Sequence, residues 1–144
     1  MSVEGILRRK GRKVLAIPQA TPVPDAVDQM KRGKVGALLV SDDGHEIQGI
    51  ISERDILHAF ASYGAGLTEM SVQDIMTKRV EACHPADSLK QIMSVMTQRR
   101  FRHMPVVDDT GLCGMISIGD VVVQRLEDAE LETNVAREAL ILSR

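Results

Sequence analysis

The chain has 144 residues, of which 44% are hydrophobic and 2% aromatic, and its formal net charge is -2 at pH 7. This length suits one domain or two tightly packed halves, with a core of Val, Ile, Leu, Met and Ala because aromatic residues are nearly absent. The balanced charge argues against a nucleic-acid binder, and the lack of any long apolar run or apolar N-terminal stretch argues against a membrane span or a secretory signal, which favours a cytoplasmic protein.

The first half of the chain is predicted to alternate short strands with amphipathic helices. The elements expected here are an N-terminal helix with a basic linker at 1–13, strand 14–17, helix 22–32, strand 37–40, turn 42–44, strand 47–51 and helix 52–60. Pro18 ends the first strand, Thr21 is the expected N-cap of the helix that follows, and Gly33 is the expected stop of that helix.

The second half of the chain is predicted to repeat this order. The elements expected here are strand 80–83, helix 88–99, strand 104–107, turn 108–111, strand 112–116 and a helix that begins at 117. The segment 121–142 predicts one long helix that exceeds what a unit of this size needs. Two alternatives stay open for its outer part, which either packs on a partner chain or forms a solvated amphipathic tail.

One phrase occurs twice in the chain, as GIISERD at residues 49–55 and GMISIGD at residues 114–120. The match extends in order through both halves, with small length changes confined to loop-like sequence, which is typical of a tandem duplication. Both copies share a glycine, a serine and an aspartate at the same spacing, namely Gly49, Ser52 and Asp55, then Gly114, Ser117 and Asp120. The two glycines are expected to meet a backbone requirement of the hairpins.

Each copy is predicted to be a β-α-β-β-α unit of about 50 residues, which buries too little surface to be stable alone. Two such units packed through their small sheets give an α/β (α+β) fold with an extended C-terminal helix. The expected boundaries are 1–13 for the N-terminal helix and linker, 14–66 for the first repeat, 67–79 for a linker, 80–128 for the second repeat and 129–144 for the helical extension.

The Ser-x-x-Asp spacing of the repeated phrase has two interpretations. In the first, the serine caps a helix and the aspartate completes a capping box near the positive end of the helix dipole. In the second, free N–H groups and the serine hydroxyl bind a phosphate at the helix start, while the aspartate accepts hydrogen bonds from a ribose diol. The residues alone leave both interpretations open.

Cysteine usage and histidine placement argue against metal binding and catalysis. Cys83 and Cys113 form no CxxC pattern and lie near no histidine cluster, so a zinc site is not expected and both thiols suit the core of a protein in a reducing compartment. No Cys/His or Ser/His pairing has positional support, and each repeated carboxylate is explained as a binding group. The protein is therefore expected not to be an enzyme and to need no catalytic cofactor.

The most specific stretches are VGALLVSDDG…IQGIISERDI at Val35–Ile56 and RFRHMPVVDDTGLCGMISIGDVV at Arg100–Val122. In this order and spacing they resemble a tandem pair of cystathionine-β-synthase-type (CBS) domains, often called a Bateman module, of the bacterial stand-alone type. The resemblance covers residues 3 to 128. It implies binding of adenosine compounds, namely AMP, ADP or ATP, or else NAD(H) or S-adenosylmethionine, in clefts between the repeats. It also implies a homodimer and regulation of a separate, unidentified partner protein.

The resemblance assigns a role to residues of both repeats. Asp55 and Asp120 are expected to hold ribose hydroxyls, with Ser52, Arg54 and Ser117 near phosphate. The adenine pockets and their opposing walls are expected to consist of Ala16, Ile17, Pro18, Ala82, Cys83 and His84, with Gly36, Ala37, Leu38, Arg102, His103 and Met104. Because the second repeat has Arg-His where the first has Gly-Ala, the two clefts are expected to differ. The rival interpretation is a constitutive interaction scaffold with vestigial clefts.

Overall fold

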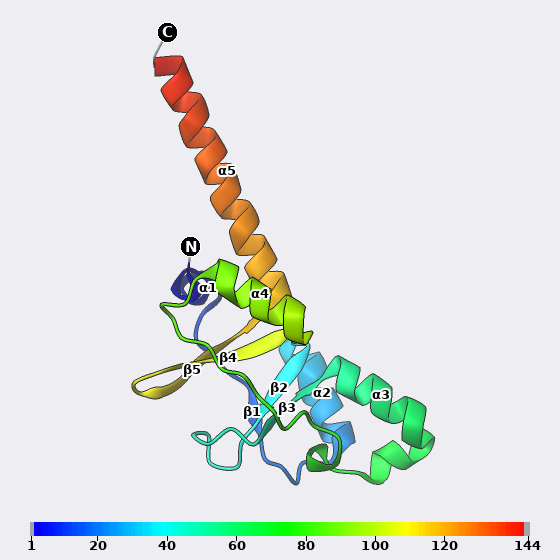
Figure 1. The fold of residues 1–144 in the computed structure, drawn as a ribbon. Coiled ribbons are helices and arrows are strands. Elements are labelled where there is room, and N and C mark those ends of the chain that lie inside the picture. Colours follow the sequence, from blue (N-terminus) through cyan, green and yellow to red (C-terminus); the bar gives the residue numbers. More distant parts are fainter. Residues whose placement is uncertain (1, 143–144) are drawn as a thin grey trace.

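Two small sheets form the two halves of the molecule, and one long helix extends away from them (Figure 1). The computed structural model describes residues 2–142, so Met1 and the last two residues of the expected extension lie outside the described residues. The helices are α1 (Val3–Lys10), α2 (Val23–Gly33), α3 (Glu53–Tyr63), α4 (Leu89–Arg99) and α5 (Ile118–Leu142), with 3-10 helices η1 (Gly64–Glu69) and η2 (Val72–Asp74). The strands are β1 (Ala16–Ile17), β2 (Ala37–Val40), β3 (Gly49–Ser52), β4 (His103–Asp108) and β5 (Gly111–Ser117).

The first sheet has the order β1-β2-β3, with β1 parallel and β3 antiparallel to the central strand β2. All four residues of β2 are buried, because both faces of this strand are covered. Leu38 and Val40 pack with residues of α2 on one face, whereas Ala37 and Leu39 pack with Leu112 and other residues of the second half. The prediction that the two repeats pack through their small sheets is therefore confirmed.

The segment before each repeat packs on the other repeat. Val3, Ile6 and Leu7 of α1 are buried in the core of the second half, together with residues of α4 and β5, and Figure 1 shows α1 beside α4 and the base of α5. In the same way, Val72 of η2 is buried in the core of the first half. The two halves are therefore joined by two segments, each of which leads into one repeat and packs on the other.

Two local predictions about the elements were wrong. Pro22, and not Thr21, precedes α2, because Pro22 is extended and its neighbour Val23 donates its N–H to the Met70 carbonyl. The expected strand 80–83 is reduced to a single bridge between Cys83 and Val106, and the residues before Cys83 instead border a cavity. The helix expected to begin at 117 begins at Ile118, directly after Ser117, and it continues to Leu142 as one long helix, as predicted.

The end of α2 also differs from the prediction. Gly33 is the last helical residue, and Lys34 adopts the left-handed conformation with φ of 52°. A Cβ on Gly33 would lie 2.5 Å from Cδ1 of Leu15, so this glycine permits a close approach and does not serve as the helix stop. The stop is a lysine in a conformation that L-residues adopt at a cost.

Replacing Lys34 by glycine is expected to stabilise the protein. Glycine adopts the left-handed C-cap conformation without steric cost, so the Lys34→Gly variant gains about 0.5–1 kcal/mol in the free energy of unfolding. Urea denaturation followed by circular dichroism measures this difference. The matched control Lys34→Ala keeps an L-residue in the same conformation and stays within about 0.5 kcal/mol of the unmodified chain. A Lys34→Gly variant less stable than Lys34→Ala would contradict the assignment.

Candidate functional site

The two copies of the repeated phrase form equivalent strand-to-helix junctions, β3 to α3 and β5 to α5. At the first, Ser52 Oγ accepts a hydrogen bond from the Asp55 N–H (3.2 Å), and the Ser52 N–H donates to Asp55 Oδ2 (3.0 Å). At the second, the Asp120 N–H donates to Ser117 Oγ (3.1 Å), and the Ser117 N–H donates to Asp120 Oδ2 (2.8 Å). The capping interpretation is therefore confirmed at both junctions, and a binding role depends on the surroundings of each aspartate.

A cavity of about 430 Å³ adjoins the first junction, within the range of small-molecule sites. Four segments from different parts of the chain meet there: the residue before β2, the β3–α3 junction, the connection that leads into the second repeat, and the chain between α4 and β4 with the first residue of β4. The lining residues are Gly36, Ile50, Ser52, Glu53, Arg54, Asp55, His58, Thr77, Arg79, Val80, Glu81, Arg100, Phe101, Arg102 and His103. Both halves of the molecule therefore contribute walls to one cavity.

The sequence did not predict the contribution of the connecting segment. Thr77 pairs with Ile50 through two backbone hydrogen bonds of 2.9 Å, and the Thr77 hydroxyl donates to Asp55 Oδ1 (3.1 Å). These contacts bring Arg79 and Val80 to the cavity, although the expected boundaries placed Thr77 and Arg79 in a linker. The sequence did carry a signal for this segment: VEGIL at residues 3–7 resembles VQDIM at residues 72–76, which extends the repeat upstream of its first strand.

Cations outnumber anions on the walls of this cavity. The four arginines are Arg54, Arg79, Arg100 and Arg102, and the three carboxylates are Glu53, Asp55 and Glu81. Glu81 is ion-paired with Arg99, outside the cavity lining. Within residues 2–142, none of the four lining arginines makes an ion pair. Their guanidinium groups are thus available to oxygen-rich anions.

His103 adds a neutral polar group to the cavity and no further charge. Its burial lowers the pKa of the imidazole, and the positive charges of Lys10 and Arg102 lower it further, against the opposing effects of Asp120 and Glu53. At neutral pH the ring therefore has one donor nitrogen and one acceptor nitrogen. Its Nε2 lies 3.4 Å from the position of a Cβ on Gly36, so this glycine lets the two repeats approach closely.

The structure brings six of the expected site residues to this cavity, namely Gly36, Ser52, Arg54, Asp55, Arg102 and His103. Five others are buried in the cores, four of them on strands and Cys83 at a single bridge: Ile17, Ala37, Leu38, Cys83 and Met104. The remaining expected residues do not line it either: Ala16, Pro18, Ala82, His84, Ser117 and Asp120. Ala82, Cys83 and Met104 instead line a shallow depression beside α4.

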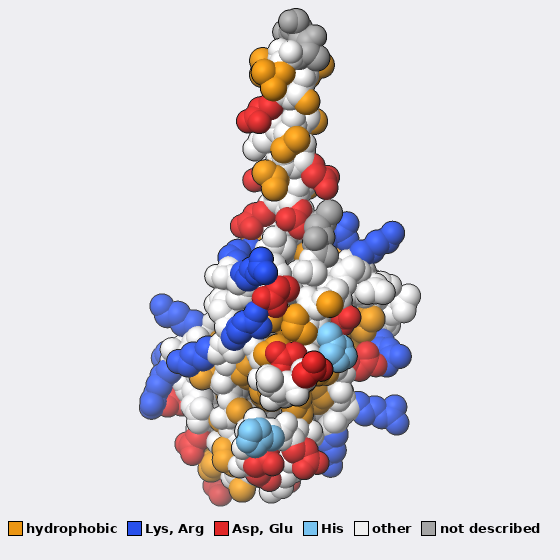
Figure 2. Space-filling model, turned by 90° about the vertical axis from the view of Figure 1, so that its left-hand side faces the viewer, with side chains coloured by type: hydrophobic (Ala, Val, Ile, Leu, Met, Phe, Trp, Pro, Cys, Tyr) orange, Lys and Arg blue, Asp and Glu red, His pale blue; other side chains and the backbone are white. Residues whose placement is uncertain are grey.

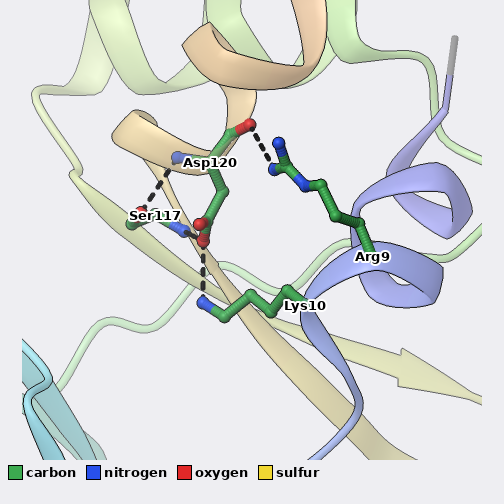
Figure 3. A network of polar contacts seen from close by, with 4 residues as sticks. All are labelled: Arg9, Lys10, Ser117 and Asp120. Atoms are coloured by element: carbon green, nitrogen blue, oxygen red, sulfur yellow. Dashed lines mark hydrogen bonds and ion pairs between the residues drawn. The ribbon is translucent and has the colours of Figure 1, made fainter. Parts of the chain in front are cut away.

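At the second junction, a cation of the chain itself meets the carboxylate (Figure 3). Lys10 Nζ lies 2.7 Å from Asp120 Oδ2, and Arg9 donates to the Asp120 carbonyl oxygen (3.3 Å). Burial raises the pKa of Asp120, but hydrogen bonds from Lys10 and the Ser117 N–H, with the charge of Lys10, outweigh burial and hold this pKa below its usual range. Asp120 lines none of the cavities described here.

The environment of the Cys83 thiol disfavours its reactive thiolate form. Burial raises the pKa of Cys83 to about 12, so this thiol stays protonated at neutral pH. Among residues 2–142, no group of three or more His, Cys, Asp or Glu side chains is placed to hold a metal ion. In the same part of the chain, no helix combines the length and apolarity that a membrane crossing requires.

Comparison with known proteins identifies the family. The CBS domain model matches residues 3–62 and 72–127. The chain is 36% identical over 129 residues to the mitochondrial CBS domain-containing protein CBSX3 of Arabidopsis thaliana, covering 84% of this chain but only 63% of that relative's length. The crystal structure of the CBS-domain protein ATU1752 from Agrobacterium tumefaciens superposes with a TM-score of 0.84 at 39% identity, covering 87% of this chain and 99% of that one.

A more distant structure shares the fold. The CBS domain pair of protein MJ0100, in complex with 5′-methylthioadenosine and S-adenosyl-L-methionine, has a TM-score of 0.73 at 22% identity and covers 88% of this chain and 98% of that one. Two successive matches to one domain model, on two halves related by an internal repeat and packed through their sheets, leave one conclusion. The chain belongs to the CBS domain family and carries two CBS domains in tandem.

Proposed function

We propose that this protein is a non-catalytic cytoplasmic regulatory module that binds an adenine nucleotide in the cavity beside Asp55 and signals its occupancy to a separate partner protein. The proposal rests on one observation. A single cavity of about 430 Å³ is lined by a carboxylate at a helix start and by four arginines that have no ion-pair partner among residues 2–142. A carboxylate suits a ribose diol, and guanidinium groups suit phosphate.

The lining residues suggest how the parts of a nucleotide are divided among the walls. Asp55 Oδ1 and Oδ2 are held in place by Thr77 and Ser52, so the carboxylate is oriented before a ligand arrives. Ile50 and Val80 supply apolar surface for a base, and the arginines supply the phosphate wall. With four lining arginines against three carboxylates, the site favours a ligand with several phosphate charges, such as ATP or ADP, over AMP.

A ligand in this cavity would contact both halves of the molecule at once. Asp55 belongs to the first repeat and Arg102 to the second, so a bound nucleotide bridges the two. A ligand shifts a conformational equilibrium by its differential affinity for the two states. Bridging therefore offers a way to convert occupancy into a change in the relative orientation of the repeats. The MJ0100 pair, which was crystallised with adenosine compounds, supports the ability of this fold to hold them.

Thermal unfolding with and without ligand tests the proposal. AMP, ADP, ATP, NADH and S-adenosylmethionine are each added in excess. A ligand present at 100 times its Kd stabilises the folded chain by about 2.7 kcal/mol, which corresponds to a Tm increase of roughly 5–10 °C for a protein of this size. If none of the five compounds raises the Tm, the rival function of a constitutive scaffold replaces the sensor. Chromatography of the bound nucleotide after incubation separates a binding module, which returns it unchanged, from an enzyme.

We also propose that the protein is a homodimer whose chains meet along α5. Beyond its first turns this helix projects from the body, and hydrophobic side chains lie along it in Figure 2. Val122, Leu126 and Ala129 follow one another at the four- and three-residue spacings of a coiled-coil seam, Ala136 lies one heptad after Ala129, and Leu126 is 60% exposed. A second copy of the same helix offers the matching seam.

Sedimentation equilibrium tests this arrangement. The unmodified chain is expected to sediment at twice its 15.8 kDa mass. Leu126→Glu places a charge in the seam and is expected to give monomers. Leu131→Glu is the matched control, because Leu131 is 64% exposed but lies on the opposite side of the helix, and it is expected to remain dimeric. Equal dissociation by both variants, or by neither, would contradict the seam.

A further inference from the structure

The two junctions present their aspartates to different partners. At the first junction, Asp55 accepts a hydrogen bond from the neutral Thr77 hydroxyl, and the carboxylate borders the cavity. At the second, Asp120 Oδ2 accepts a hydrogen bond from Lys10 Nζ at 2.7 Å, and the two side chains form an ion pair. In both cases the contacting residue lies in the segment before the other repeat, Thr77 at the first junction and Lys10 at the second.

The position of Lys10 is fixed by its helix. It is the last residue of α1, whose Val3, Ile6 and Leu7 are buried in the core of the second half. Arg9, the residue before it, donates to the Asp120 carbonyl and pairs with Glu127, so two successive cations attach α1 to the start of α5 (Figure 3). The packed helix therefore holds Lys10 beside Asp120, although the lysine side chain is 38% exposed.

An ammonium group in this place excludes a ribose. It neutralises the charge that would attract a diol, and it takes the same Oδ2 that the Ser117 N–H contacts. A sugar hydroxyl could replace the ammonium group only after the ion pair had been broken, which loses the attraction between the two charges and leaves the Asp120 carboxylate, 21% exposed, without its cation.

We propose that Lys10 closes the second junction to nucleotides, so that each chain binds one nucleotide, at the first junction. This inference rests on the proposed function, and it makes Lys10 the residue that sets the stoichiometry. The duplication produced two junctions with the same Ser-x-x-Asp phrase, and the residue supplied by the preceding segment decides which of them is open. The Thr77 hydroxyl leaves the Asp55 carboxylate charged and available to a ribose, whereas the Lys10 ammonium group pairs with the Asp120 carboxylate.

Isothermal titration calorimetry tests the proposal with AMP, ATP and S-adenosylmethionine as probes. The unmodified chain is expected to bind one equivalent of at least one probe, and Lys10→Met is expected to bind two. Arg8→Met is the matched control: it lies on the same helix, its side chain is 79% exposed and pairs with Glu4, and it is expected to bind one equivalent. Two equivalents on the unmodified chain, or one on Lys10→Met, would overturn the closure.

A measurement without ligand separates the two proposals. The pKa of the Asp120 carboxyl, followed by carbon-13 NMR, is expected to rise in Lys10→Met, since Lys10 helps to hold it down. An unchanged pKa would overturn the ion pair, and with it the closure, whatever the titrations show. If none of the probes binds either protein while the pKa of Asp120 does rise, the proposed nucleotide function is wrong, and so is the proposed stoichiometry. The ion pair between Lys10 and Asp120 would still be confirmed.

Discussion

Replacing Asp55 by asparagine is expected to weaken nucleotide binding by about 10- to 150-fold, which corresponds to the loss of charged hydrogen bonds worth about 1.5–3 kcal/mol. The change removes the negative charge that a ribose diol would meet at the cavity wall. The fold is expected to persist, because an asparagine oxygen still accepts hydrogen bonds from the Ser52 N–H and hydroxyl. The Thr77 hydroxyl can turn to accept a bond from the new amide. Calorimetric titration with ATP, next to thermal unfolding without ligand, measures both effects.

The chain contains a matched control for this substitution. Asp74 makes the same contacts with Ser71 that Asp55 makes with Ser52, accepting from the serine N–H at 3.0 Å and from its hydroxyl at 3.1 Å. Asp74 lines none of the cavities described above. Asp74→Asn therefore reproduces the loss of a capping carboxylate without touching the proposed site, and it is expected to leave ATP affinity unchanged. Equal losses for Asp55→Asn and Asp74→Asn would reduce Asp55 to a capping residue.

The fold was predictable because its signals are local and occur twice. The run of apolar residues in β2 and the amphipathic pattern of α2 each predict one element, and the repeated phrase relates the halves. Capping by Ser52 and Ser117, one of the two interpretations that the residues left open, occurs at the start of both helices. Burial on both faces of β2 also explains why that strand reads as a continuous apolar run instead of an alternating one.

The site was less predictable, because its walls are assembled by contacts across the chain. Thr77 and Arg79 carry no motif of their own, and they reach the cavity because the backbone of Thr77 pairs with Ile50. Lys10 belongs to a basic stretch that reads as solvated surface. Its contact with Asp120 follows from the burial of α1 in the second half, which composition does not reveal. Equivalent phrases therefore gave unequal junctions.

The role of the repeated glycines is the clearest correction to the sequence analysis. Gly49 and Gly114 were expected to serve a backbone requirement of the hairpins, but neither has a positive φ. Each instead makes room for the segment that crosses from the other side of the repeat. A Cβ on Gly49 would lie 2.7 Å from the Thr77 carbonyl oxygen, and one on Gly114 would lie 2.6 Å from Cδ2 of Leu7.

These distances predict unequal costs for the same substitution. In Gly49→Ala the new methyl group meets backbone that is itself paired with Ile50, so the connecting segment must move. In Gly114→Ala it meets the end of a leucine side chain, which can rotate. Because overpacking in a packed region costs typically 1–3 kcal/mol, Gly49→Ala is expected near the upper end of that range and Gly114→Ala near the lower end. Chemical denaturation with a constant m value measures both.

Gly49→Ala is also expected to weaken nucleotide binding, although Gly49 does not line the cavity. A displaced Thr77 backbone takes its hydroxyl away from Asp55 and shifts Arg79, so the carboxylate loses its orientation and the phosphate wall loses a member. Gly66→Ala is the control, since a Cβ there would meet nothing within 4 Å, and it is expected to change neither stability nor affinity by more than about 0.5 kcal/mol. Loss of stability in Gly49→Ala with unchanged ATP affinity would show that the connecting segment supports the fold without shaping the site.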